Sequence, residues 1–171
     1  MKYLNIANSI LVLLLIAYLL FTLINKNQTV VYIDTATIYN SFEMKKDFEV
    51  KLIAEQEYKN SILDSLQNQI ELIGQFEKNK KEKEIKISQL QKKYKTKYEQ
   101  FETDNITKSQ QYNEQIWGRI NEYIKEYAIE NKHEIILGAN GTGSLMYADN
   151  KIDVTENVIM YINSRYANTK K

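Results

Sequence analysis

The 171-residue sequence has no cysteine, no proline, only five glycines and a single histidine. The lack of cysteine excludes disulfides, thiolate nucleophiles and cysteine-ligated metals. The lack of proline means that no residue removes a backbone donor from the interior of a long helix. A net charge of +1 provides no overall attraction for nucleic acid. The composition therefore favours a largely helical protein without thiol chemistry, and we expect no nucleic-acid partner.

Near the N-terminus, residues 4–24 carry no charged side chain, and their most apolar part is 10–21, ILVLLLIAYLLF. A membrane-spanning helix needs about 20 apolar residues, whereas the core of a signal peptide needs about 7–15 and a small-residue cleavage site. Because the following residues, TLINKNQT, contain no clear cleavage site, the sequence favours an anchor in the inner membrane over a cleaved signal segment. Both remain open. In either case residues 1–27 form a separate segment, and 28–171 are expected outside the cytoplasm.

Two long stretches, about 45–77 and 84–130, repeat apolar residues at spacings of three and four. A narrow apolar seam between polar flanks is typical of a coiled-coil helix pair. The polar stretch EKNKKEKE at 77–84 separates the two, which favours an antiparallel helical hairpin, with one continuous rod as the alternative. The apolar face of this arm is expected to include Ile62, Leu66, Ile70, Tyr94, Tyr98 and Phe101, most of which would hold the two helices together.

Short strands are predicted on either side of this arm. TVVYID at 29–34 reads as a strand, followed by a short helix through Phe42 capped by Thr37. EIIL at 134–137 and SLMYA at 144–148 are joined by GANGTG, a strong turn signal. Asp153 is expected to cap a last helix, with Glu156 in the capping-box position. The predicted fold is α+β and mostly α: a small β-sheet or barrel body (28–42 and 131–165), a hairpin arm (about 43–130) and a preceding hydrophobic helix.

The glycine-rich loop, with Gly138, Asn140, Gly141 and Gly143, raises the alternative of a phosphate site. A P-loop needs a lysine and a hydroxyl residue after its last glycine, and a dinucleotide fingerprint must open a helix. Here no lysine lies in the loop, and a strand is expected to follow. We therefore interpret the loop as a structural turn. His133 is expected at the surface, and no catalytic, cofactor or metal site is predicted.

Charge is segregated along the predicted arm. Residues 78–97 contain nine lysines and two glutamates, whereas 43–77 and 98–130 each carry a net charge of −4. A hairpin would gather the lysines at its tip, where they are candidates for binding acidic client segments or anionic lipid. The alternative is a solvated helix face that only keeps the arm soluble. The candidate lysines are Lys78, Lys80, Lys81, Lys83, Lys86, Lys92 and Lys93.

Two segments, VVYIDTATIYNSF and EIILGANGTGSLMYADNKIDVTENVIMYIN, together resemble the Skp/OmpH-type periplasmic chaperones. The similarity spans about 28–165. It implies a homotrimer in which strands of three subunits form a β-barrel body and three helical hairpins surround a cavity. It also implies an ATP-independent, non-enzymatic holdase for unfolded outer-membrane proteins, without a cofactor. The open edges of a three-stranded sheet independently favour an oligomer. The alternative function is a membrane-anchored structural stalk, to which a C-terminal sheet would be of no use.

Overall fold

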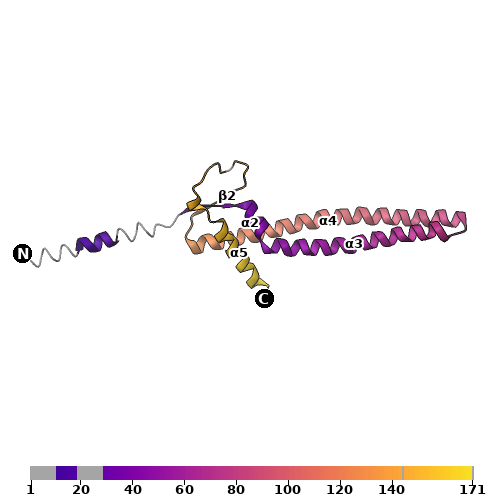
Figure 1. Ribbon diagram of the computed structural model, residues 1–171, viewed down its shortest axis with the longest axis horizontal. Helices are drawn as coiled ribbons and strands as arrows, with labels where there is room; N and C mark the ends of the chain where they lie inside the picture. Colours follow the sequence, from indigo (N-terminus) through magenta and orange to yellow (C-terminus); the bar gives the residue numbers. More distant parts are fainter. Residues whose placement is uncertain (1–10, 19–28, 144, 171) are drawn as a thin grey trace, which may run out of the picture.

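The computed structural model describes residues 11–18, 29–143 and 145–170. A long two-helix arm projects from a small body, and the last helix crosses the base of the arm (Figure 1). Residues 11–18 also form a helix. From residue 29 onward the elements are β1 (Val30–Asp34), α2 (Thr35–Ser41), α3 (Glu43–Phe76), α4 (Lys80–Asn131), β2 (Ile135–Ala139), the short 3₁₀ helix η1 (Asn150–Ile152) and α5 (Thr155–Thr169).

The arm is an antiparallel hairpin of α3 and α4, which lie side by side along the whole of α3 (Figure 1). The predicted hairpin is confirmed, and the continuous rod is wrong. The reversal is shorter than the polar stretch suggested, because α4 begins at Lys80, where Asn79 caps it by accepting a hydrogen bond from the Glu82 amide at 3.3 Å. The 34 residues of α3 give an arm of about 50 Å.

The sheet has two parallel strands, with Val31 opposite Ile136 and Asp34 opposite Ala139. The whole arm is therefore the crossover between neighbouring strands. On its other edge, β1 forms a single bridge to Asp153, and the Val154 amide donates to the Tyr32 carbonyl at 3.0 Å. The sheet therefore joins the two ends of the arm in one body.

The prediction of a further strand at 144–148 was wrong, since residues 145–148 are not in a strand. Gly141 and Gly143 both have positive φ, 71° and 98°. The Asn140 side chain accepts a hydrogen bond from the Thr142 amide at 3.0 Å. These bends carry the chain into a projecting loop instead of reversing it against β2, so the predicted β-hairpin does not form (Figure 1).

Two helix caps also differ from the predictions. Asp34, not Thr37, caps α2, since its Oδ1 accepts from the amides of Ala36 and Thr37 at 2.9 and 3.0 Å. The last helix begins at Thr155, and Val154 instead of Asp153 occupies its N-cap position. Asp153 instead precedes the helix and accepts from the amide and hydroxyl of Thr155 at 2.8 and 2.6 Å. The predicted capping box is replaced by this local contact.

The core lies where β1, α2 and α5 meet the body end of α4. Phe42, between α2 and α3, is completely buried, and its ring lies edge-on to Tyr123 and Tyr166 at 6.3 and 5.4 Å. Burial of such side chains provides most of the stability of a small body. The other fully buried side chains are Val31, Ile38, Ile120, Val158 and Ile162.

Of the hydrophobic helix predicted at 4–24, only residues 11–18 belong to the described part, where they are helical; the remainder lies outside it. Among the described residues, no helix combines the length and hydrophobicity that crossing a membrane requires.

Candidate functional site

The predicted apolar face of the arm is mostly turned inward. Leu66 and Phe101 are buried, with exposed fractions of 4% and 9%. Ile62, Ile70 and Tyr94 are half-buried. Tyr98 is instead 48% exposed and stacks on Tyr94 with ring centroids 6.5 Å apart. Most of this face therefore holds the two helices together, and Tyr98 contributes to the outer surface.

Sequence reasoning missed a polar layer inside the arm. The Lys59 side chain is only 7% exposed, and its ammonium donates to Oδ1 of Asn105 at 2.6 Å. The Asn105 amide in turn donates to Oε1 of Gln56 at 2.7 Å. A signal was present, because Lys59 lies seven residues after Leu52 and seven before Leu66, at a seam position. A single polar residue at such a position fixes the register of a coiled coil at a cost in stability.

The predicted lysines at the arm tip divide into two groups. Lys83 donates to the Gly74 carbonyl at the end of α3, and Lys86 pairs with Glu77 and Glu82 at 3.0 and 2.8 Å. The hydrogen bonds to Glu82 and Glu77 raise the pKa of Lys86. These two lysines stabilise the turn itself.

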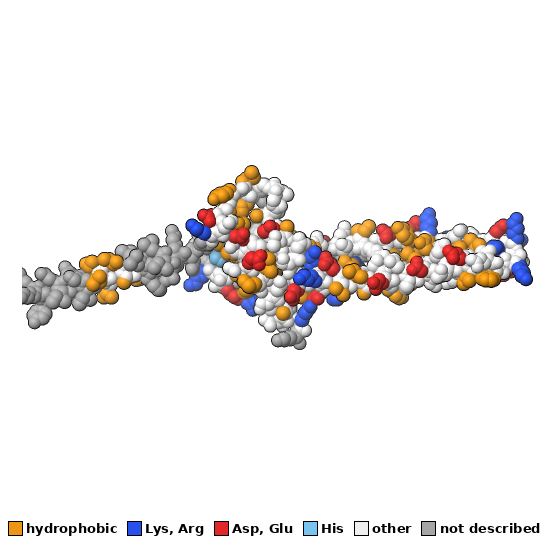
Figure 2. Space-filling model, in the orientation of Figure 1, with side chains coloured by type: hydrophobic (Ala, Val, Ile, Leu, Met, Phe, Trp, Pro, Cys, Tyr) orange, Lys and Arg blue, Asp and Glu red, His pale blue; other side chains and the backbone are white. Residues whose placement is uncertain are grey.

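The other five predicted lysines are exposed and form no ion pair with any described residue. Figure 2 shows basic side chains gathered at the end of the arm. We call the outermost three, Lys78, Lys80 and Lys81, the free tip lysines; Lys92 and Lys93 lie further along α4.

Large apolar side chains are exposed along the whole arm (Figure 2). They occur near the body, in the middle and at the tip, on both helices. Apolar groups spread in this way offer many weak contacts instead of one shaped pocket. With their exposed fractions they are Val50 (66%), Ile53 (60%), Tyr58 (67%), Leu72 (55%), Phe76 (72%), Ile85 (50%) and Ile106 (60%).

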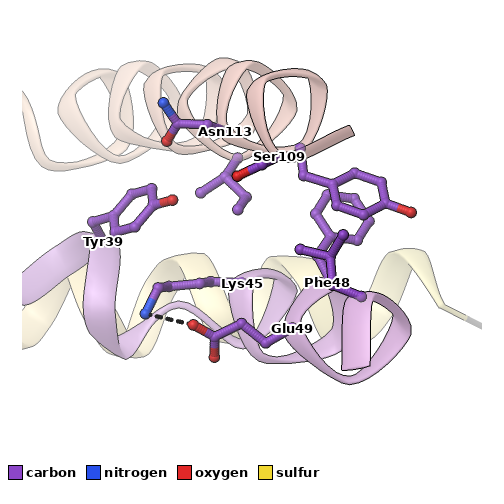
Figure 3. Close-up of a pocket in the computed structure, with 9 residues that line it drawn as sticks. Tyr39, Lys45, Phe48, Glu49, Ser109 and Asn113 are labelled. Carbon is purple, nitrogen blue, oxygen red and sulfur yellow. Dashed lines mark ion pairs between the residues drawn. The ribbon is translucent and has the colours of Figure 1, made fainter. Parts of the chain in front are cut away.

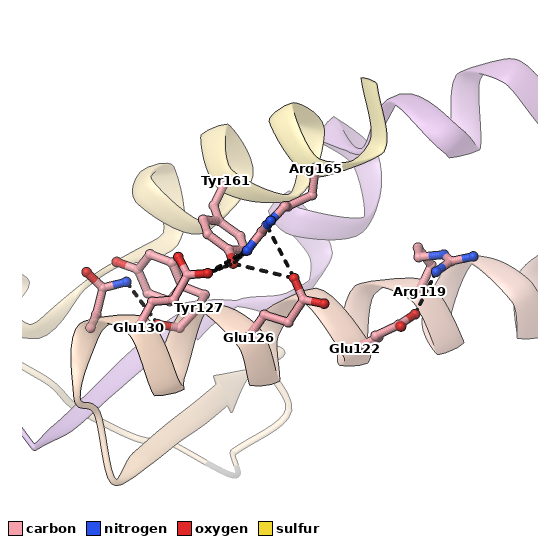
Figure 4. Close-up of polar contacts among 8 residues, drawn as sticks. Arg119, Glu122, Glu126, Tyr127, Glu130, Tyr161 and Arg165 are labelled. Atoms are coloured by element: carbon pink, nitrogen blue, oxygen red, sulfur yellow. Dashed lines mark hydrogen bonds and ion pairs between the residues drawn. The ribbon is translucent and has the colours of Figure 1, made fainter. Parts of the chain in front are cut away.

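Helix α5 attaches the arm to the body through both arm helices. On α4, the Arg165 guanidinium pairs with Glu130 at 2.5 Å and Glu126 at 3.3 Å, and it also donates to the Tyr161 hydroxyl (Figure 4). On α3, Asp47 accepts from the Tyr166 hydroxyl at 2.7 Å and pairs with Lys170. The base of the arm is thereby held on two sides.

Of the predicted turn residues, Gly138 lies instead in strand β2, opposite Ile33, because the strand continues to Ala139. Asn140, Gly141 and Gly143 lie in the loop that follows, and no basic side chain lies between Asn140 and Asp149. A shallow hollow nearby is lined by Asp34, Asp153 and Glu156. Burial raises the pKa of Asp153, but hydrogen bonds from Thr155 outweigh it and leave that pKa below its usual value. Among the described residues, no group of histidine, aspartate and glutamate side chains is arranged to hold a metal ion.

Residues 29–162, well over half of the chain, match the family model described as outer membrane protein (OmpH-like). The chain belongs to the OmpH-like family. The resemblance inferred from the two terminal segments is thereby confirmed.

Among solved structures, the OmpH-like chain resembles a candidate outer membrane chaperone (OmpH-like) from Caulobacter crescentus CB15. The two share 14% sequence identity with a TM-score of 0.59, over 80% of this chain and 85% of that one. At this identity the likeness supports the fold. No curated protein matches the sequence.

Proposed function

We propose that this OmpH-like protein is an ATP-independent holdase that binds unfolded outer-membrane or other exported proteins in the periplasm. The observation that carries the proposal is the arm: a thin two-helix projection with apolar side chains exposed from base to tip. An arm that served only as a spacer would gain nothing from exposed groups such as Phe76 and Tyr58.

Holding an unfolded chain requires many weak contacts of low specificity. Apolar burial stabilises by about 25 cal/mol per Å², so several partly buried side chains together retain a client while each contact remains exchangeable. Binding of this kind needs no nucleotide, and the glycine-rich loop lacks the lysine that a phosphate site would require.

The proposal includes a homotrimer in which three arms enclose the client. It is supported by the outer edge of β2, which pairs with no other described strand, and by the partly exposed apolar side chains on the two strands, Val30 (39%), Ile135 (49%) and Leu137 (41%). Residues 4–24 would tether the trimer to the inner membrane unless they are cleaved. Native mass measurement and N-terminal sequencing of the mature protein test both points.

The alternative function, a membrane-anchored stalk, is less well supported. A stalk gains length from a continuous rod, whereas this arm turns back at Glu77–Asn79 and returns its end to the sheet. No observation on the described residues favours the stalk over the holdase.

The decisive experiment mixes residues 28–171 with an unfolded outer-membrane β-barrel protein diluted from urea, without nucleotide. We expect light scattering from aggregation to be suppressed at near-stoichiometric amounts. Aggregation that proceeds unchanged at several-fold molar excess of the OmpH-like protein would contradict the holdase. A helical protein of similar size and charge serves as the control for non-specific protection.

A further inference from the structure

Two hollows adjoin on one side of the arm near the body. The first, of about 130 Å³, lies between Tyr39, Phe48 and Asn113 (Figure 3). The second, of about 330 Å³, lies between Ile53, Gln56 and Asn105. Leu52 and Ser109 line both, so the hollows lie next to each other. We call the combined feature, between the body ends of α3 and α4, the base groove.

The groove is open because of one small residue. On the opposite side of the seam, Lys108 of α4 bridges to Glu55 of α3 and closes that side, as flanking charges do in a coiled coil. On the groove side, the next residue of α4 is Ser109, whose side chain is too short to reach across. The side chains of Ser109 and Asn113 form no hydrogen bond with another described residue, so their hydroxyl and amide groups are available.

The two walls of the groove differ in chemistry. The α3 wall is apolar, with Phe48, Leu52 and the 60% exposed Ile53. The α4 wall is a row of amide and hydroxyl groups at every fourth position: Asn105, Ser109 and Asn113.

This row repeats at a spacing that suits an extended chain. Four residues of helix advance by about 6 Å. Two residues of an extended chain advance by about 6.6–6.8 Å, and successive side chains point in opposite directions. Over three positions the mismatch is small, so alternate backbone groups of an extended segment can meet the row while its alternate side chains lie on the apolar wall.

The lining of the groove offers no unpaired charge, which favours an uncharged occupant. Lys45 and Glu49, at the end of the groove, pair with each other at 2.9 Å, and no other lining residue is charged. The two arm segments around the groove, 43–77 and 98–130, each carry a net charge of −4 and so disfavour acidic segments.

We propose that the base groove binds an extended, uncharged segment of a client, recognising its backbone through Ser109 and Asn113 and its apolar side chains through the α3 wall. This inference rests on the proposed holdase function and specifies the part of a client that the arm base accepts. It distinguishes the groove from the rest of the arm surface, which offers only dispersed apolar contacts.

The single tryptophan provides a direct readout. Trp117 stacks on Tyr39, which lines the groove, with ring centroids 5.2 Å apart. The probe is a capped nine-residue peptide of alternating leucine and serine, titrated into the full chain in lipid nanodiscs, with empty nanodiscs subtracted. Saturable change in Trp117 fluorescence is expected.

Ser109→Leu fills the groove and should weaken peptide binding by roughly tenfold. The matched control is Ser88→Leu, because Ser88 lies three heptads before Ser109 on α4, is exposed and lines neither hollow. That variant should bind within about twofold of the unmodified chain. A peptide methylated on alternate backbone nitrogens loses its donors toward the row and should also bind roughly tenfold more weakly.

Equal binding by the Ser109 and Ser88 variants would overturn the proposal. The proposal would also be overturned if the methylated peptide bound as tightly as the unmethylated one, because binding would then depend on apolar contacts alone. A Trp117 signal that depends on protein concentration without peptide would assign the groove to a second copy instead. If the aggregation assay succeeds while the peptide does not bind, only the groove proposal fails; failure of both removes the holdase as well.

Discussion

The ammonium of Lys59 lies within the arm, 2.6 Å from Oδ1 of Asn105 on the opposite helix. Its other close neighbour is the Phe101 ring, whose centroid is 5.6 Å away. A buried charge held by one amide and one aromatic face stabilises little by itself, but it is costly when its partner is removed.

Two substitutions in this layer should therefore differ in their effect on stability. Asn105→Ala removes the acceptor and should lower the free energy of unfolding by about 1–3 kcal/mol. Lys59→Met keeps the apolar stem, removes the charge and should change it by less than about 1 kcal/mol. Urea unfolding followed by circular dichroism measures both, and a larger loss for Lys59→Met than for Asn105→Ala would contradict this account.

A second prediction concerns the contact between α5 and α3 at low pH. Hydrogen bonds from Lys170 and Tyr166 hold the pKa of Asp47 below its usual value. A depressed carboxyl pKa contributes stability above the unfolded value of about 3.9 and loses it as the pH falls through the folded value. The stability difference between the unmodified protein and Asp47→Asn should therefore be constant at pH 5–7 and shrink below pH 4. Thermal unfolding across pH 2.5–7 tests this, and a difference that is independent of pH would refute it.

Two glycines should respond oppositely to alanine. A Cβ on Gly138 would lie 2.9 Å from Cγ2 of Thr35, whose hydroxyl donates to the Ala139 carbonyl at 3.0 Å. Moving Thr35 would break that hydrogen bond, so Gly138→Ala should destabilise by about 1–2 kcal/mol. Gly118 lies within α4 with nothing within 4 Å of an added Cβ, so Gly118→Ala should stabilise by about 0.5–1 kcal/mol. Unfolding midpoints that shift in the same direction would argue against the described packing around β2.

Two phenylalanines separate stability from client binding. Phe42 is completely buried, and Phe42→Ala should cost about 3–5 kcal/mol. Phe76, at the arm tip, is 72% exposed, so Phe76→Ala should change stability by no more than about 0.5 kcal/mol. If exposed apolar groups hold clients, Phe76→Ala should nevertheless weaken protection in the aggregation assay. A Phe76 variant that is as protective as the unmodified chain would place client contacts elsewhere.

The free tip lysines test whether the tip recognises anionic surfaces. Changing Lys78, Lys80 and Lys81 to glutamine together should weaken binding to anionic vesicles at low salt by about 1 kcal/mol per lysine. The matched control changes three exposed lysines of the arm base and body, Lys46, Lys125 and Lys151. Vesicle co-sedimentation that falls equally in both variants, or in neither, would leave the tip lysines with a role in solubility alone.

The arm was predictable because its signal is repeated many times. Spacings of three and four over two long stretches set the helix type, and the polar break set the reversal, although the turn proved to be only Glu77–Asn79. In the body, each strand is short and its sequence signal occurs only once. SLMYA has good strand composition, yet two glycines with positive φ redirect the chain before it, and the tertiary contact between β1 and β2 decides the sheet.

Individual polar residues were harder still to predict. Asp34 and Thr37 are both good cap residues three positions apart, and only the start of α2 at Thr35 selects Asp34. The base groove depends on which side of the seam Lys108 and Ser109 face. That is set by the rotation of α4 about its own axis, which the spacing of apolar residues alone does not determine.

The parallel pairing of Val31 with Ile136 has a consequence for how the protein is made. Strand β1 emerges from the ribosome or translocon about a hundred residues before its partner β2. It therefore remains unpaired while the intervening hairpin is synthesised. The hairpin of α3 and α4 can form first. It then brings the two strands close together, which reduces the entropic cost of pairing them. A chain truncated before Ile135 would thus retain a helical arm with no sheet to close its base.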